Sequence, residues 1–185
     1  MYLIVGLGNP EPEYSKTRHN MGFDVINRLS EKFDINVNKE KFNALVGTGI
    51  IEGEKVILAK PQTYMNSSGE AVKPLANFYK INPENIILIY DDIDIETGSM
   101  KIRKKGGAGT HNGMKSVVAE LGTTLFPRVR VGTGKNEKIP NLIDYVIKKV
   151  DDVEYKKLEE GVVKGAEAID EILKLGIDKA MNNLN

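Results

Sequence analysis

The sequence predicts an α/β fold in which a mixed, mostly parallel central sheet is flanked by helices and residues 1–185 form a single domain. Short apolar runs alternate along the chain with segments whose apolar residues recur at helical spacing, which is the pattern of strands alternating with helices. The most apolar run, at 86–90, predicts a buried central strand. A length of 185 residues suits one well-packed domain and is short for two.

The first half of the chain predicts three strands and two helices. The strands are expected at 2–6, 43–50 and 55–59, and the helices at 21–33 and from a start near 66–70 to about 79. A tight turn at Glu52-Gly53-Glu54 would join the second and third strands into a hairpin. Pro74 lies inside the second helix, so that helix is expected either to kink or to start later.

The second half predicts three more strands and two more helices. The strands are expected at 86–90, 99–103 and 128–132, and the helices at about 113–121 and from 151 onward. The last helix is long and amphipathic, so it would close the domain against the sheet. Asn112 stands at a helix start and could be its N-cap. The segment 136–150 is a candidate lid.

The composition excludes several kinds of site. Because the chain has no cysteine, disulfides, thiol nucleophiles and zinc–thiolate sites are excluded, and a cytoplasmic location is expected. The first apolar run is only five residues long and follows no basic leader, so it predicts a strand and not a signal peptide. No apolar run approaches the roughly 20 residues that span a bilayer, so no membrane partner is expected.

Charge is balanced overall but unevenly distributed. The 26 basic and 26 acidic residues give a net charge of zero, which by itself suggests no nucleic-acid partner. A basic run with no acidic residue follows directly after an acidic stretch at 91–96; its members are Lys101, Arg103, Lys104, Lys105 and Lys115. Together with the glycine-rich loop at 106–113, this run suits phosphate or the backbone of RNA. The alternative is a solvated charged face.

The two histidines are the strongest candidates for chemistry, and each is followed by asparagine and soon by glycine. Histidine is the usual proton acceptor in a hydrolase without a cofactor. His19 and Asp91 both lie at the ends of predicted core elements, so the carboxylate could fix the tautomer of the imidazole and stabilise its cation. No serine lies in a nucleophile-elbow pattern, so the nucleophile would be water.

A glycine pattern after the first strand is weak evidence for a dinucleotide site. Gly6 and Gly8 match the start of the fingerprint, but its third glycine would fall at Glu11. The same turn instead places the Asn9 amide, which both donates and accepts hydrogen bonds, at the carboxyl end of the strand.

Several stretches, in the same order along the chain, resemble those of bacterial peptidyl-tRNA hydrolases. They are Val5–Pro10, Tyr14, Thr17–Gly22, Lys60–Gly69, Asp91–Asp94, Gly106–Gly113 and Arg128–Gly134. The resemblance implies a metal-independent esterase without a cofactor, active as a monomer in the cytoplasm. It would hydrolyse the ester bond between a peptide, or an N-blocked amino acid, and tRNA, and so recycle peptidyl-tRNA released prematurely from ribosomes.

The resemblance also implies roles for individual residues. His19 would be the general base that activates water, Asp91 would orient it, and Asn9 would help to distinguish an acylated amino group from a free amine. The residues expected to contact the tRNA 3′ end or the peptide are Tyr14, Tyr64, Met65, Asn66 and Asn112. Lys101 and Arg103 would face the 5′ phosphate at the acceptor stem.

Two competing functions remain open from the residues alone. The basic run could serve a non-catalytic RNA-binding module. Alternatively, Asp91, Asp92 and Asp94 could ligate magnesium, or could bind zinc or manganese together with His19 or His111, although the lysines that follow would compete for the carboxylates.

Overall fold

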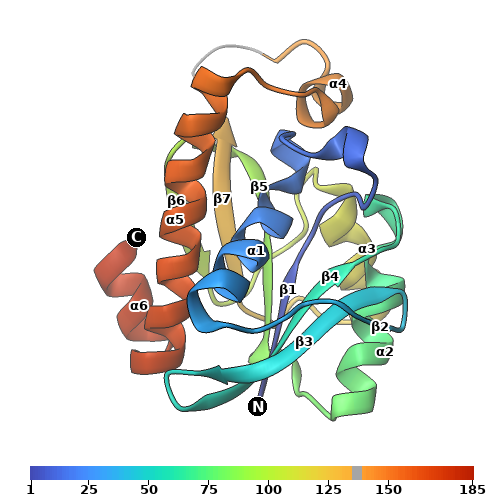
Figure 1. The fold of residues 1–185 in the computed structure, drawn as a ribbon, viewed down its shortest axis with the longest axis vertical. Coiled ribbons are helices and arrows are strands. Elements are labelled where there is room, and N and C mark those ends of the chain that lie inside the picture. Colours follow the sequence, from blue (N-terminus) through green and yellow to red (C-terminus); the bar gives the residue numbers. More distant parts are fainter. Residues whose placement is uncertain (135–138) are drawn as a thin grey trace.

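The computed structural model describes residues 1–134 and 139–185 and is built around a seven-stranded sheet (Figure 1). In spatial order its strands are β2 (Lys39–Lys41), β3 (Ala44–Ile51), β4 (Glu54–Pro61), β1 (Tyr2–Gly6), β5 (Ile86–Glu96), β7 (Arg128–Gly134) and β6 (Met100–Arg103). The four strands from β4 to β7 run parallel, and β2, β3 and β6 pair antiparallel with their neighbours. The expected mixed sheet with a parallel core is confirmed.

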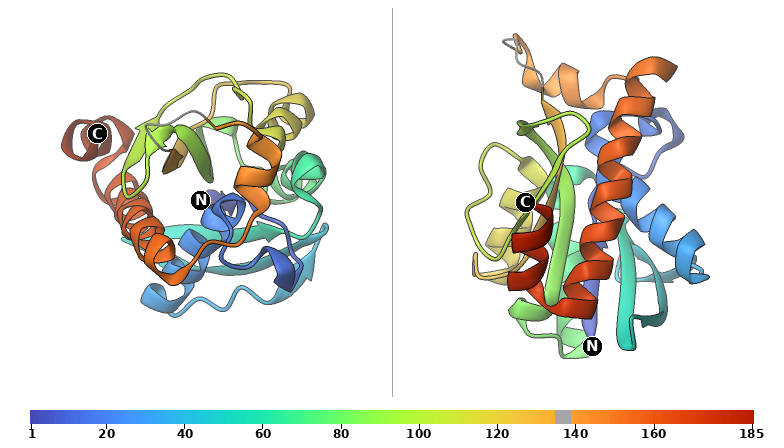
Figure 2. Two further views of the ribbon diagram at one scale, coloured as in Figure 1. Left: turned by 90° about the horizontal axis from the view of Figure 1, so that it is seen from above. Right: turned by 90° about the vertical axis from the view of Figure 1, so that its left-hand side faces the viewer.

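Helices cover both faces of the sheet (Figures 1 and 2). They are α1 (Met21–Phe33), α2 (Gly69–Tyr79), α3 (Asn112–Leu121), α4 (Leu142–Ile147), α5 (Asp152–Leu175) and α6 (Ile177–Leu184). Helices α1 and α5 share one hydrophobic core with the sheet, and α2 and α3 share a second core on the opposite face. Helix α6 packs beside the edge strand β6.

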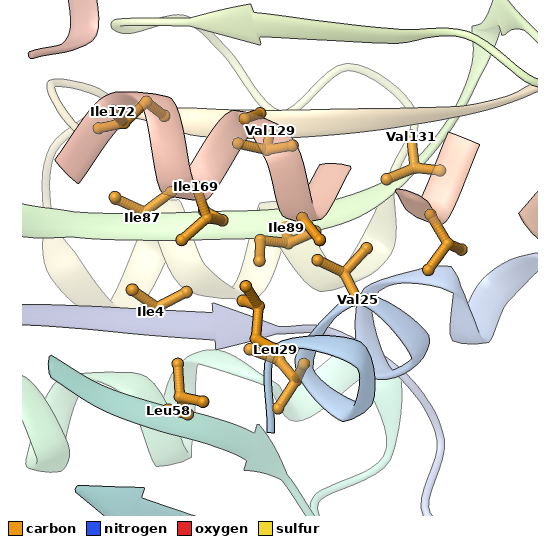
Figure 3. Close-up of a cluster of buried hydrophobic side chains, with 14 of the residues drawn as sticks. Ile4, Val25, Leu29, Leu58, Ile87, Ile89, Val129, Val131, Ile169 and Ile172 are labelled. Carbon is orange, nitrogen blue, oxygen red and sulfur yellow. The ribbon is translucent and has the colours of Figure 1, made fainter. Parts of the chain in front are cut away.

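The alternation of side chains along β5 divides it between the two cores. Ile87 and Ile89 point into the core under α1 and α5, where Figure 3 shows them facing Val25 of α1 and Ile169 of α5. The alternate residues Ile86, Leu88 and Tyr90 belong to the core under α2 and α3. Because successive residues of a strand face opposite sides, Asp91 continues the row that starts with Ile87 and Ile89.

Most expected elements are confirmed; β5 and the tail helix differ in extent, and β2 and α4 were not among the expected elements. Strand β5 runs to Glu96 and does not end at residue 90, because β7 continues to pair with it beyond that point. The tail contains two helices, since the chain turns at Gly176, whose φ is +88°. Helix α2 begins at Gly69 and continues through Pro74, so the later start is wrong. The short strand β2 lacked a sequence signal.

Two glycines bring the first helix into backbone contact with the centre of the sheet. A Cβ atom at Gly6 would overlap the carbonyl of Gly22, and one at Gly22 would overlap the backbone of Leu7 and the carbonyl of Ile89. No other residue type would allow α1 to start this close to β1 and β5. The preceding 3₁₀ turn, Arg18–Asn20, is thereby held at the carboxyl end of the parallel strands.

The candidate lid at 136–150 lies partly outside the described residues. Its described part contains α4, which lies at the same end of the molecule as the Arg18–Asn20 turn (Figure 1). Arg18 connects the two, because its guanidinium donates to the Tyr145 carbonyl over 3.2 Å and stacks on the Tyr145 ring. Among residues 1–134 and 139–185, every helix is too short or too polar to cross a membrane.

Candidate active site

His19 and Asp91 meet in a buried hydrogen bond at the carboxyl end of the central strands. The His19 Nδ1 atom lies 2.9 Å from one carboxylate oxygen of Asp91 and 3.1 Å from the other. A carboxylate only accepts hydrogen bonds, so Nδ1 carries the proton and Nε2 keeps a free lone pair. The sequence placed both residues at the ends of core elements, and the structure brings them together.

The pKa values of the pair move in the directions that a base and its orienting acid require. Burial alone would lower the pKa of His19, but the Asp91 carboxylate outweighs it and raises the pKa above the ordinary 6.5. Burial alone would likewise raise the pKa of Asp91, but the neighbouring histidines hold it well below its usual range. Asp91 is therefore ionised at any physiological pH.

The second histidine binds the same carboxylate. His111 Nε2 lies 2.9 Å from Asp91 Oδ1, and the two imidazole rings are 4.9 Å apart between centroids. The His111 Nδ1 atom accepts from the backbone N–H of Met114, so His111, and not Asn112, is the N-cap of α3. Nε2 must then carry the ring proton and donate it to Asp91. Asp91 thus accepts one N–H from His19, just before α1, and one from His111, just before α3.

The pairing of His111 with Asp91 is the contact that the sequence does not predict. The sequence marks His111 as one of two candidate histidines and as a possible metal ligand, but it gives no partner for its ring. The signal that could have found it is the shared pattern of histidine, asparagine and a following glycine around both histidines.

Asn9 is buried and held in one orientation. Its side-chain oxygen accepts from the backbone N–H of Met65 over 2.8 Å. Its own backbone N–H and carbonyl pair with the side chain of Asn20, the neighbour of His19, over 2.8 and 3.0 Å. With the oxygen occupied, the amide of Asn9 keeps its NH₂ group as the available donor.

The other residues expected at the peptide and the tRNA end lie on both sides of this centre. Met65 is buried, and its sulfur lies against the start of α3 at Gly113. Asn66 follows it in an exposed position on the 3₁₀ turn Met65–Ser67. Tyr64 is exposed, and its hydroxyl donates to Glu11 close to Tyr14.

A cavity of about 700 Å³ opens beside the two histidines, between β5, β6, the loop at 106–112 and α4. The expected phosphate-binding residues Lys101 and Arg103 line it, as does Asn112, whereas Asn9, Tyr14 and residues 64–66 lie outside it. Register pairs Lys101 with Arg130 and Arg103 with Arg128, so four cations share one face of β6 and β7. The cavity therefore offers a concentrated positive surface although the chain has no net charge.

One group of side chains could hold a metal ion among the described residues. His19, Asp91 and His111 offer ligand atoms that lie within 4.8 Å of one another. Asp92 and Asp94 are not part of it. Asp92 forms an ion pair with Arg130 at 3.1 Å and accepts from the backbone N–H of Asp94. The triple-aspartate centre considered from the sequence is therefore not assembled.

Comparison with known proteins gives one consistent result. A family model described as peptidyl-tRNA hydrolase matches residues 3–185. A peptidyl-tRNA hydrolase of Thermoanaerobacter sp. (strain X514) is 52% identical, with each chain covered completely, and one of Clostridium botulinum (strain Alaska E43 / Type E3) is 50% identical over 100% of this chain and 96% of its own.

A solved structure extends the likeness to the fold. The crystal structure of peptidyl-tRNA hydrolase from Acinetobacter baumannii superposes with a TM-score of 0.92 at 35% identity, covering 100% of this chain and 94% of the other. The sequence match and the fold agree over the whole length. This chain therefore belongs to the peptidyl-tRNA hydrolase family.

Proposed function

We propose that this chain hydrolyses the ester bond between a peptide, or an N-blocked amino acid, and the terminal ribose of tRNA, and so recycles peptidyl-tRNA. The observation that carries the proposal is the buried His19–Asp91 hydrogen bond, which leaves the Nε2 lone pair of His19 free to take a proton. Membership of the family supports the substrate, since its relatives bear the name peptidyl-tRNA hydrolase.

The proton moves from water to His19. Nε2 accepts it as the water oxygen attacks the ester carbonyl, and the imidazolium that forms is stabilised by the ionised Asp91. The same proton can then pass to the ribose oxygen as the ester bond breaks. Both ring nitrogens of His111 are engaged in this cycle, since Nε2 donates to Asp91 and Nδ1 accepts from the Met114 N–H. Its part is to hold the carboxylate in place.

Two asparagines suit the polar groups of the substrate. The exposed amide of Asn66 is a donor for the oxyanion of the tetrahedral intermediate, and loss of one such donor typically costs on the order of a hundredfold or more in rate. The Asn9 donor suits the acyl oxygen of a blocked amino group. A free ammonium group offers only donors and could not accept from it. This difference would spare ordinary aminoacyl-tRNA.

The tRNA would be held through its phosphates, with Lys101 and Arg103 at the acceptor-stem 5′ end and Tyr14, Tyr64, Met65 and Asn112 near the 3′ end and the peptide. We propose further that the enzyme acts as a monomer in the cytoplasm and needs no metal, since ester hydrolysis can proceed with a positioned base and hydrogen-bond donors alone.

Replacement of His19 by alanine tests the proposal. Turnover of N-acetyl-aminoacyl-tRNA should fall by roughly 10²–10⁴-fold, the usual contribution of a general base, while tRNA affinity stays within about twofold. Glu84→Ala, an exposed change before β5 at the opposite end of that strand, is the matched control and should behave as wild type. Near-normal turnover by His19→Ala would remove His19 from its role.

Two further measurements separate the competing functions. A non-catalytic RNA-binding module predicts that the purified protein retains tRNA but leaves the ester intact. A metal-dependent hydrolase predicts loss of activity after exhaustive treatment with a chelator and recovery on adding zinc or manganese. We expect ester cleavage that is unchanged by the chelator.

A further inference from the structure

The side chain of Arg128 is buried next to the active site without a role in the mechanism above. It is 1% exposed, at the first position of β7, and lines the cavity beside the two histidines. Its side chain donates four hydrogen bonds to backbone carbonyls, those of Thr124 and Gly107 at 2.9 and 3.1 Å and twice that of Phe126 at 3.2 and 3.3 Å, and it also contacts the Tyr90 hydroxyl. Burying a guanidinium charge costs desolvation free energy, which these hydrogen bonds must offset.

We infer that Arg128 is a positioning residue for His111, acting through the carbonyl of Gly107 and through Tyr90. The inference rests on the proposed function, because it makes the loop at 106–110 part of the machinery that holds Asp91 in place. Arg128 touches no reacting atom in this scheme. It fixes the loop that ends in the histidine.

The first route runs along the backbone of the loop. Three of its five residues are glycine, and Gly106 and Gly109 have positive φ, so the loop has high conformational freedom before it is tethered. Arg128 binds its second residue, Gly107. The next residue, Ala108, accepts from the backbone N–H of His111 over 3.3 Å. The tether is thus one residue away from the hydrogen bond that closes the turn before α3.

The second route runs through the ring of Tyr90, which precedes Asp91 in β5. The Tyr90 ring lies edge-on against the His111 ring, with 5.0 Å between centroids. Its hydroxyl lies close to the Arg128 guanidinium, whose charge favours the phenolate and opposes the burial that raises the pKa of Tyr90. Arg128 therefore controls both the backbone that carries His111 and the surface on which its ring rests.

Arginine is needed for this geometry. Its planar fork reaches Gly107 from one nitrogen and Thr124 from the other, which a single ammonium group cannot do. Arg128→Lys keeps the positive charge in the cavity and loses the fork. Positioning and a purely electrostatic role therefore predict different results for this one substitution.

The first experiment compares the kinetics of Arg128→Lys with wild type at a temperature where both are folded. We expect kcat to fall roughly ten- to a hundredfold, the usual effect of a small misplacement, with KM for the tRNA substrate changed less than threefold. Ile172→Ala, in the core under α5, is the control for lost stability and should leave kcat unchanged. Wild-type kcat in this variant would show that the fork of the guanidinium is not needed and would overturn the inference, whether or not KM rises.

The second experiment measures the ring ¹⁵N chemical shifts of the histidines by NMR without substrate. Its result does not depend on whether ester cleavage is observed. The chain has only two histidines, which makes the ring signals assignable. In wild type, His111 should show the Nε2–H tautomer, and Arg128→Lys should shift its signals toward a tautomer mixture. Tyr90→Phe, which keeps the ring, should give a smaller shift and a two- to fivefold lower kcat.

If Arg128→Lys does not fold, Tyr90→Phe still tests the positioning role of Arg128. Unchanged His111 signals together with unchanged kcat in that variant would then overturn the inference. If the wild-type protein shows no ester cleavage, the proposed function is refuted. The NMR measurements on the histidine rings would then still test the role of Arg128.

Discussion

At the scale of single residues, the feature that organises the site is one carboxylate shared by two histidines. The hydrogen bonds assign every ring nitrogen: His19 carries its proton on Nδ1, and His111 carries its own on Nε2. One histidine is free to accept a proton, whereas the other is committed at both nitrogens. The two rings therefore differ in their hydrogen bonding although they bind the same carboxylate.

Asp91→Asn should move the acid limb of the pH–rate profile to lower pH. The active form of His19 is the one with Nε2 unprotonated, and the Asp91 carboxylate raises the pKa of that ring. Removing the carboxylate therefore lowers the pKa of His19 and the pH at which activity appears. The amide also favours the wrong tautomer, so kcat on the plateau should fall by about 10²–10⁴-fold. A pH series of kcat measures both effects; an acid limb displaced upward would contradict the assignment.

His111→Asn should move the same limb in the opposite direction. The asparagine oxygen can still accept from the Met114 N–H and cap α3, but its side chain is too short to reach Asp91. Relieved of one donor, Asp91 interacts more strongly with His19 and raises its pKa further, so activity should appear at higher pH and kcat should fall. Thermal unfolding serves as the control, and only a small change in Tm is expected because the cap is kept.

Sequence reasoning could find His19 and Asp91, because each lies at the end of a recognisable element. It could not find the pairing of His111 with Asp91. That contact joins a loop after β6 to a strand in the middle of the sheet, and glycines 106, 107 and 109 leave the path of the loop undetermined by local preferences. The roles of Asn9, Asn66 and the tyrosines remain predictions.

At the scale of elements, a half-buried acid joins the two helices on one face of the sheet. Asp24 of α1 accepts from the hydroxyl of Tyr155 of α5 over 2.9 Å. Burial raises the pKa of Asp24 to about 6, helped by the negative charge of Glu159 and opposed by the Tyr155 hydrogen bond and Lys60. The contact orients α1 against α5, yet it places an ionised group where solvation is poor.

Asp24→Asn should therefore stabilise the protein at neutral pH. A carboxyl whose folded pKa is raised disfavours folding once the unfolded chain ionises, so the penalty appears as pH rises from about 4 to about 6 and persists above. The amide keeps an acceptor for Tyr155 and has no charge. The free energy of unfolding should rise by up to about 3 kcal/mol at pH 7 and change little at pH 4. Urea unfolding at both pH values measures this, and equal gains at both would contradict it.

Element types were easier to predict than element ends. The strand at 86–90 was recognised by its apolar run, but the polar residues 91–96 belong to it because β7 provides a pairing partner beyond Tyr90. In the tail, helical periodicity continues past the turn at Gly176, so one helix was expected where two occur. In both places a tertiary contact or a single positive φ outweighs the local pattern.

At the scale of the whole molecule, a chain without net charge concentrates its cations on one surface. Lys101, Arg103, Arg128 and Arg130 face the same cavity, and only Arg130 has a carboxylate partner there among the ion pairs of the described residues. Phosphate binding at such a surface releases counterions, so it weakens as salt rises. The single-domain organisation of residues 1–185 stays a prediction.

Lys101→Ala should weaken tRNA recognition without altering the chemical step. We expect KM to rise several-fold at low salt, kcat to stay near wild type, and the slope of log KM against log salt to fall by about 0.7–0.9, the value for one lost phosphate contact. Lys174→Ala, an exposed lysine at the end of α5, is the control and should keep the wild-type slope. An unchanged slope for Lys101→Ala would place the phosphate elsewhere.

The sequence by itself determined the α/β fold and the family, and it predicted the base and its acid, because apolar periodicity and short motifs are local properties of the chain. The tertiary structure decided that His111 shares Asp91, that Asp92 pairs with Arg130, and that two rows of cations face one cavity. Those facts depend on which strands become neighbours and on how closely Gly6 and Gly22 let α1 approach them, and the free energy of such contacts is set by residues far apart in the chain.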